Sequence, residues 1–183
     1  VSRRLFGGPL DECEVLLWGA GKAAEVTARH FMKSGVRHLW IVNRTQPKAQ
    51  DLASLCSGGW LSWEQALARL AHVDIAVVCT QAPHYVIDEA DVAAAMPRRG
   101  ARPLCLIDLA VPRNVDPAVR CRPGVALYDI DDLQTLARRG LAARREELAQ
   151  CERIIGEQVG RFERWREPLT NEEVEPCPVL ASS

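Results

Sequence analysis

A short glycine-rich segment near the N-terminus carries the strongest chemical signal in the sequence. It reads Gly-Ala-Gly-Lys-Ala-Ala, follows an apolar run at 13–18 and opens a helical pattern at 22–34. In such a turn the first glycine allows a sharp bend and the second lets the backbone approach a pyrophosphate, whose oxygens meet the free amides of the helix start. The predicted phosphate-binding residues are Gly19, Ala20, Gly21, Lys22, Ala23 and Ala24. The alternative is a structural glycine turn that binds no ligand.

A basic segment follows the second apolar run, about twenty residues after the glycines. Dinucleotide sites for NAD normally place Asp or Glu here to bind the ribose hydroxyls. This sequence has no acid there and instead has Asn43, Arg44 and Thr45, with Lys48 one helical turn later. Because a guanidinium suits a doubly ionised phosphate, these residues predict a preference for NADP(H) over NAD(H). The alternative is a turn whose arginine is merely solvated.

A third candidate segment follows the fourth apolar run. In doubly wound sheets, ligands lie at the carboxyl ends of the strands, so this segment is expected to contact the nicotinamide half through its backbone. It consists of Thr80, Gln81, Ala82 and Pro83. His84 comes next, and a single loop histidine without a visible partner is more often structural or solvated than an acid or base. No residue is assigned a catalytic role.

The elements that must position these residues alternate along the chain. Apolar runs predict strands at 13–18, 38–42, 59–61, 74–79, 103–107 and 125–128, and helical spacing predicts helices at 22–34, 47–55, 62–70 and 89–96. Gly35 is expected to end the first helix, and Ser62 with Gln65 has capping-box spacing. Alternating strands and helices indicate an α/β fold, a doubly wound and mainly parallel Rossmann-type sheet.

One long amphipathic helix is predicted to follow the sheet. Apolar residues recur at spacings of three and four through 129–168, with Asp129 and Asp132 placed to cap the start. Such a helix would be about 50 Å long, so something besides the sheet must bury its far half. The predicted division is a Rossmann domain at 1–128, a long linker helix at 129–168 and a disordered tail at 169–183.

The bulk properties favour a cytoplasmic protein. The formal net charge is −1, so the chain as a whole does not point to nucleic acid or an anionic membrane. The seven cysteines stand singly, without a Cys-x-x-Cys pair, which favours reduced, mostly buried thiols and gives no metal site. No signal peptide opens the sequence, and no apolar run approaches the roughly 20 residues that a membrane span needs.

Taken in order, the motifs resemble those of glutamyl-tRNA reductase over nearly the whole chain. The matching segments are 19–22, 28–30, 43–45, 82–84, 107–113 and 127–133. Shikimate dehydrogenase is similar in the first half, where it shares the glycine turn and Asn-Arg-Thr. Three positions depart from the reductase pattern: Ala23 stands where methionine is common, Ala24 where glycine or serine is, and Gln81 where glycine is.

The resemblance implies a mechanism and a set of partners. A cysteine of an N-terminal catalytic domain would attack glutamyl-tRNA, form a thioester and release tRNA, after which NADPH would reduce the thioester to glutamate-1-semialdehyde for tetrapyrrole synthesis. That domain and the family's dimerisation domain are expected to lie outside this sequence. The partner that carries the cysteine would therefore make the contact with glutamyl-tRNA. Four arginines on the long helix could touch tRNA phosphates, although a solvated face is the favoured interpretation: Arg138, Arg139, Arg144 and Arg145.

Two other functions stay open at this stage. The first is a stand-alone NADP-dependent dehydrogenase for a small molecule, like shikimate dehydrogenase. The second is a non-catalytic module that binds NADP(H) or a partner through the apolar stripe of its long helix.

Overall fold

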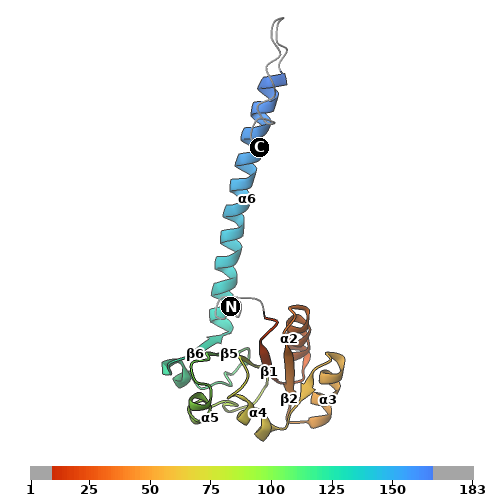
Figure 1. The fold of residues 1–183 in the computed structure, drawn as a ribbon, viewed down its shortest axis with the longest axis vertical. Coiled ribbons are helices and arrows are strands. Elements are labelled where there is room, and N and C mark those ends of the chain that lie inside the picture. The colour runs from red at the N-terminus through yellow and green to blue at the C-terminus, as the bar shows by residue number, and fades with distance from the viewer. Residues whose placement is uncertain (1–9, 167–183) are drawn as a thin grey trace, which may run out of the picture. The chain divides into compact units, whose positions relative to one another are not determined.

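The computed structural model describes residues 10–166 and contains a six-stranded sheet with helices between the strands (Figure 1). The strands are β1 (Glu14–Trp18), β2 (His38–Val42), β3 (Gly59–Trp60), β4 (Ile75–Val78), β5 (Leu104–Asp108) and β6 (Val125–Asp129). The α-helices are α2 (Lys22–Lys33), α3 (Gln46–Leu55), α4 (Trp63–Arg69), α5 (Glu89–Ala95) and α6 (Ile130–Arg166), and the short 3₁₀ helices are η1 (Met96–Arg98) and η2 (Pro117–Cys121).

All strand pairs are parallel, and the strand order is β3-β2-β1-β4-β5-β6. This is the order of a Rossmann-type sheet built from two halves that meet between β1 and β4. The predicted fold class is therefore confirmed. The order also places a topological switch point at β1 and β4, where such folds bind their ligands.

Local signals in the sequence set most of the element ends. Gly35 has φ +75° just after α2, and Ser62 and Gln65 form the predicted capping box of α4. The helix predicted at 89–96 ends one residue early and continues as η1, because Pro97 has no N–H to continue the α-helical pattern. The strand predicted at 74–79 is limited to β4, with one flanking residue left outside the strand at each end.

Two hydrophobic cores cover the two faces of the sheet. Alternate residues of β1 point to opposite faces, so that Leu17 belongs to the core that includes residues of α2 and α3, while Leu16 belongs to the core that includes residues of α4 and α5. Ala24 and Ala28 of α2 are fully buried against the first face. Because both faces are covered, the central strands are apolar throughout, and the polar chemistry is confined to the edges where the strands begin and end.

The strand register brings the candidate segments to one edge of the sheet. Trp18, the last residue of β1, lies beside Val42 and Val78, the last residues of β2 and β4. Val78 lies in turn beside Asp108 at the end of β5. The loops that begin at residues 19, 43, 79 and 109 therefore leave the sheet at the same level.

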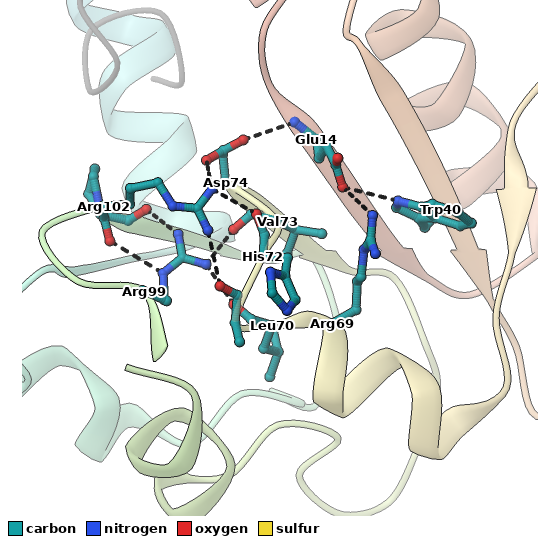
Figure 2. Close-up of polar contacts among 11 residues, drawn as sticks. Glu14, Trp40, Arg69, Leu70, His72, Val73, Asp74, Arg99 and Arg102 are labelled. Atoms are coloured by element: carbon teal, nitrogen blue, oxygen red, sulfur yellow. Dashed lines mark hydrogen bonds and ion pairs between the residues drawn. The ribbon is translucent and has the colours of Figure 1, made fainter. Parts of the chain in front are cut away.

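The opposite edge is held together by a buried arginine. Arg99 is 3% exposed, and its guanidinium donates to the carbonyl oxygens of Leu70 at 2.6 Å and Val73 at 2.5 Å (Figure 2). It also donates to the carbonyl oxygen of Pro103 at 2.5 Å. Arg102 donates to the carbonyl of His72 at 3.1 Å and to that of Ala71 at 3.0 Å. These contacts tie together the segments that lead into β4 and β5.

The same edge also carries an ion pair beside β1. Arg69 donates to Glu14 at 2.7 Å and lies 4.8 Å from the ring centre of Trp40 (Figure 2). Burial raises the pKa of Glu14, but hydrogen bonds from Arg69 and Trp40 and the charge of Arg69 outweigh it, so the net pKa lies below the ordinary value. Glu14 therefore stays ionised at neutral pH.

Helix α6 begins as predicted, with a reciprocal cap. The Asp129 carboxylate accepts from the N–H of Asp132 at 3.0 Å, and the Asp132 carboxylate accepts from the N–H of Asp129 at 3.1 Å. The chain divides into two compact units, one up to Gln134 and the other from Thr135. None of the described helices is both long and apolar enough to cross a membrane. The predicted tail at 169–183 lies outside the described residues.

Candidate nucleotide-binding site

A cavity of about 570 Å³ opens at the carboxyl edge of the sheet, within the size range of small-molecule and cofactor sites. Its lining comes from the segments that follow β1, β2 and β4 and from the start of α4. The lining residues are Gly19, Ala20, Gly21, Lys22, Ala23, Asn43, Arg44, Trp63, Cys79, Thr80, Gln81, Ala82, Pro83 and His84. This lining from the described residues contains Lys22 and Arg44 but no carboxylate, so its charge suits an anion.

The glycine turn has two glycines with different constraints. Gly19 has φ +117°, and a Cβ built there would lie 2.5 Å from the carbonyl oxygen of Cys79. Gly21 has an ordinary backbone, and a Cβ there would meet no atom within 4 Å. Gly19 is therefore required by the fold itself, whereas the space beside Gly21 is left open at the start of α2.

The start of α2 lies beside that space and has no side-chain cap. Gly21 is the N-cap residue of α2 and makes no side-chain cap hydrogen bond. The first amides of an α-helix have no partner within the helix, and the helix dipole gives that end a partial positive charge. An uncapped helix start beside open space, with Lys22 next to it, is an arrangement that binds phosphate.

Asn43 and Arg44 line the cavity at the end of β2. The Asn43 side chain donates to the carbonyl of Thr45 at 3.0 Å, which fixes the turn into α3. Arg44 is exposed, and no carboxylate among the described side chains forms an ion pair with it. Its guanidinium is therefore available for an anionic ligand.

The loop at 80–84 forms another wall of the cavity and is held from behind. Asn114 is fully buried; it accepts from the Thr80 hydroxyl at 2.5 Å and donates to the carbonyls of Ala82 and His84. Asp108, 2% exposed at the end of β5, accepts from the N–H of Asn114 at 2.8 Å. The buried carboxylate of Asp108 therefore holds Asn114 in place, and Asn114 in turn holds the loop at 80–84.

The predicted binding residues come together, apart from three. Ala24 lies in the core behind the turn, where its small side chain lets α2 lie close to β1. Thr45 and Lys48 follow Arg44 into α3, and both are exposed outside the lining of the cavity. All the other predicted residues line the cavity.

Sequence reasoning missed Trp63 in the lining and the bracing pair Asp108 and Asn114. A carboxylate directly after a buried strand was a visible signal for Asp108, whereas nothing local marks Trp63, which reaches the cavity from the start of α4. Cys79 belongs to the cysteines expected to be mostly buried, and it lines the cavity. The expectation of mostly buried thiols holds for Cys13, Cys56 and Cys105 but not for the exposed Cys121 and Cys151.

The thiol in the cavity is a poor nucleophile. Burial, with a smaller contribution from the charge of Asp108, raises the pKa of Cys79 to about 11, against a hydrogen bond with Thr27 that lowers it. A reactive cysteine needs its pKa lowered so that the thiolate is present. Cys79 is therefore protonated at neutral pH.

The fold and the cavity together define a Rossmann-type nucleotide-binding domain. A family model described as shikimate / quinate 5-dehydrogenase matches residues 1–136, so the chain belongs to that family. The predicted resemblance to glutamyl-tRNA reductases is also confirmed. The chain is 42% identical over 169 residues to the glutamyl-tRNA reductase of Solidesulfovibrio magneticus. The aligned region covers 92% of this chain and 37% of that protein.

Solved structures agree with this assignment. The glutamyl-tRNA reductase of Methanopyrus kandleri matches with a TM-score of 0.74 and 32% identity, covering 90% of this chain and 44% of that chain. The nucleotide-binding domain of glutamyl-tRNA reductase from Thermoplasma volcanium matches with a TM-score of 0.57 at 17% identity. The match covers 73% of this chain and 86% of that chain, and at this identity it supports the fold alone. The chain spans less than half the length of the full reductases it matches.

Proposed function

We propose that this chain is the NADP(H)-binding portion of a glutamyl-tRNA reductase. The observation that carries the proposal is one cavity that combines an uncapped helix start beside Gly21 with Arg44, which forms no ion pair with a described carboxylate. The first suits a pyrophosphate and the second suits the 2′-phosphate that distinguishes NADP from NAD. The similarity to reductases over most of the chain supplies the reaction.

The residues of the cavity fit this cofactor. Gly21 leaves space for a pyrophosphate, because a Cβ there would project into open space rather than into protein. Arg44 would bind the 2′-phosphate on the β2 side of the switch point, and the loop at 80–84 would contact the nicotinamide half on the β4 side. The chemistry supplied by the bound cofactor would be hydride transfer to a glutamyl thioester, which yields glutamate-1-semialdehyde and the free thiol.

The covalent step is assigned to another domain or chain. Cys79, the cysteine that lines the cavity, has a raised pKa and is unsuited to attack an ester. We therefore assign the nucleophilic cysteine, and with it the contact to glutamyl-tRNA, to a partner. In this proposal the present chain contributes cofactor binding and orientation.

Calorimetric titration of Arg44→Ala with NADPH and with NADH tests the cofactor assignment. Affinity for NADPH should fall by more than about tenfold, because a charge-assisted contact to the 2′-phosphate is lost, while affinity for NADH should barely change. Arg37→Ala is the matched control. Arg37 is exposed and directly precedes β2, so this substitution removes the same charge at the opposite end of the strand. Equal losses for NADPH and NADH in Arg44→Ala would refute the assignment.

An activity assay tests the division of labour. The chain alone, given glutamyl-tRNA and NADPH, should form no semialdehyde, and activity should require a protein that supplies the cysteine. Semialdehyde formed by this chain alone would show that its nucleophile lies within the sequence.

A stand-alone NADP-dependent dehydrogenase is the second candidate, favoured by the match of residues 1–136 to the shikimate / quinate 5-dehydrogenase model. Turnover of a small hydroxy acid, followed by the absorbance of NADPH, would support it over the first candidate.

A further inference from the structure

The hydrogen bonds that join the loop at 80–84 to other described segments all involve one residue, while Ala82 also packs against the hydrophobic core. Within residues 10–166, each hydrogen bond that joins this loop to another segment involves Asn114. The loop leaves the sheet after β4 and lies at the wall of the cavity, where Gln81, Pro83 and His84 are exposed. Asn114 therefore supplies the polar contacts that hold the loop at the cavity.

The side chain of Asn114 uses its full donor capacity in this role. Its Oδ1 accepts from the Thr80 hydroxyl at 2.5 Å, and its Nδ2 donates to the carbonyl of Ala82 at 2.8 Å and to that of His84 at 3.2 Å. An amide has one oxygen and two N–H donors, so all three are engaged. Neither an aliphatic side chain nor a carboxylate could satisfy the same three partners.

Asn114 is itself held rigidly. Its N–H donates to one carboxylate oxygen of Asp108, which also accepts from Val115 at 2.9 Å, while the other oxygen accepts from Ala110 at 3.0 Å. The carbonyl of Asn114 accepts from the N–H of Val86 at 2.6 Å. A fully satisfied buried polar network of this kind fixes one conformation.

The loop lies on one half of the cavity. The sheet has two halves that meet between β1 and β4, with Arg44 at the end of β2 in one half and the loop after β4 in the other. We propose that Asn114 is a positioning residue that sets the loop at 80–84 against the nicotinamide half of NADP(H), without touching the adenosine half. This inference rests on the proposed function.

Titration with two ligands separates the halves. NADPH contains both halves, whereas adenosine 2′,5′-bisphosphate contains the ribose phosphate for Arg44 but no nicotinamide. In the full chain with Asn114→Ala, affinity for NADPH should fall by about tenfold or more, because the loop loses its hydrogen bonds. Affinity for the bisphosphate should stay within about twofold of wild type, since the β2 side is untouched.

A pair of variants at Thr80 gives a second measurement that does not depend on the folding of Asn114→Ala. Thr80→Val removes the hydroxyl that donates to Asn114 and keeps the shape, so NADPH affinity should fall a few-fold. Thr80→Ser keeps the hydroxyl and should lose less NADPH affinity than Thr80→Val does. Neither Thr80 variant should change binding of the bisphosphate.

Four outcomes would overturn the inference. Unchanged NADPH affinity in folded Asn114→Ala would show that the loop needs no such brace, and equal loss of both ligands would show a general structural role. If Asn114→Ala does not fold, equal NADPH affinities in Thr80→Val and Thr80→Ser would overturn it. Failure of the wild-type chain to bind either ligand would overturn the proposed function, and this inference with it.

Discussion

The two glycines of the turn after β1 serve different purposes. Gly19 has a left-handed backbone and packs against the Cys79 carbonyl, so the fold requires it. Gly21 has an ordinary backbone and faces open space, so the fold does not require it. Gly21 is therefore the position at which we propose that the pyrophosphate approaches the backbone.

This contrast predicts the effect of adding one methyl group at each position. Gly21→Ala should keep the wild-type unfolding temperature but lower NADPH affinity by about tenfold or more, because the new Cβ occupies the space proposed for the pyrophosphate. Thermal unfolding and calorimetric titration would measure the two effects. Gly19→Ala is the matched comparison, and it should destabilise the fold, by about 1–3 kcal/mol.

If the NADPH affinity of Gly21→Ala is unchanged, the proposal that the pyrophosphate binds at the start of α2 is wrong. A marked loss of stability in the same variant would instead mean that Gly21 serves the fold.

At the scale of elements, the two edges of the sheet have separate tasks. The carboxyl edge carries the cavity, and the amino edge carries the network around Arg99. Burial lowers the pKa of Arg99 to about 10, with a further lowering by the charge of Arg102, so the guanidinium stays charged at neutral pH. Its hydrogen bonds to main-chain carbonyls stabilise the entry into β4 and β5, while the opposite ends of those strands lead into the cavity.

Removing this arginine should therefore affect stability rather than binding. Arg99→Ala leaves four buried or partly buried carbonyls without this donor and should lower the free energy of unfolding by about 3 kcal/mol. Arg98→Ala, at the exposed neighbouring position, should change it by less than about 0.5 kcal/mol. Denaturant unfolding measures both variants, and folded Arg99→Ala should bind NADPH as wild type does. Weakened binding in the folded variant would contradict this separation of the edges.

At the scale of the whole molecule, the chain divides between Gln134 and Thr135, and all lining residues of the cavity belong to the first unit. The boundaries predicted from the sequence, 1–128, 129–168 and 169–183, stay a proposal about which segments fold independently. Apolar residues of α6 in the second unit are exposed, among them Leu148 and Ile155.

Truncation after Gln134 tests whether the first unit is self-sufficient. The shortened chain should fold and bind NADPH within about twofold of the full chain, because it retains the entire sheet and cavity. Circular dichroism would establish folding, and titration would give the affinity. A folded but non-binding truncated chain would mean that residues after 134 contribute to the site.

The sequence by itself determined the features that depend on near neighbours. Apolar periodicity predicted the strands and helices, Gly35 and Ser62 marked helix ends, and the segments around Gly21 and Arg44 were recognisable from their places after β1 and β2. Helix capping, turns and periodicity are settled within a few residues, so they can be read along the chain.

Only the tertiary structure decided how distant segments meet. The bond between Thr80 and Asn114 joins residues 34 positions apart, and Trp63 reaches the cavity from the start of another helix. Arg99 likewise finds carbonyls of a segment that lies 26 and 29 positions earlier. These contacts depend on strand order and register, which no local pattern encodes, because register is fixed by packing across the whole sheet.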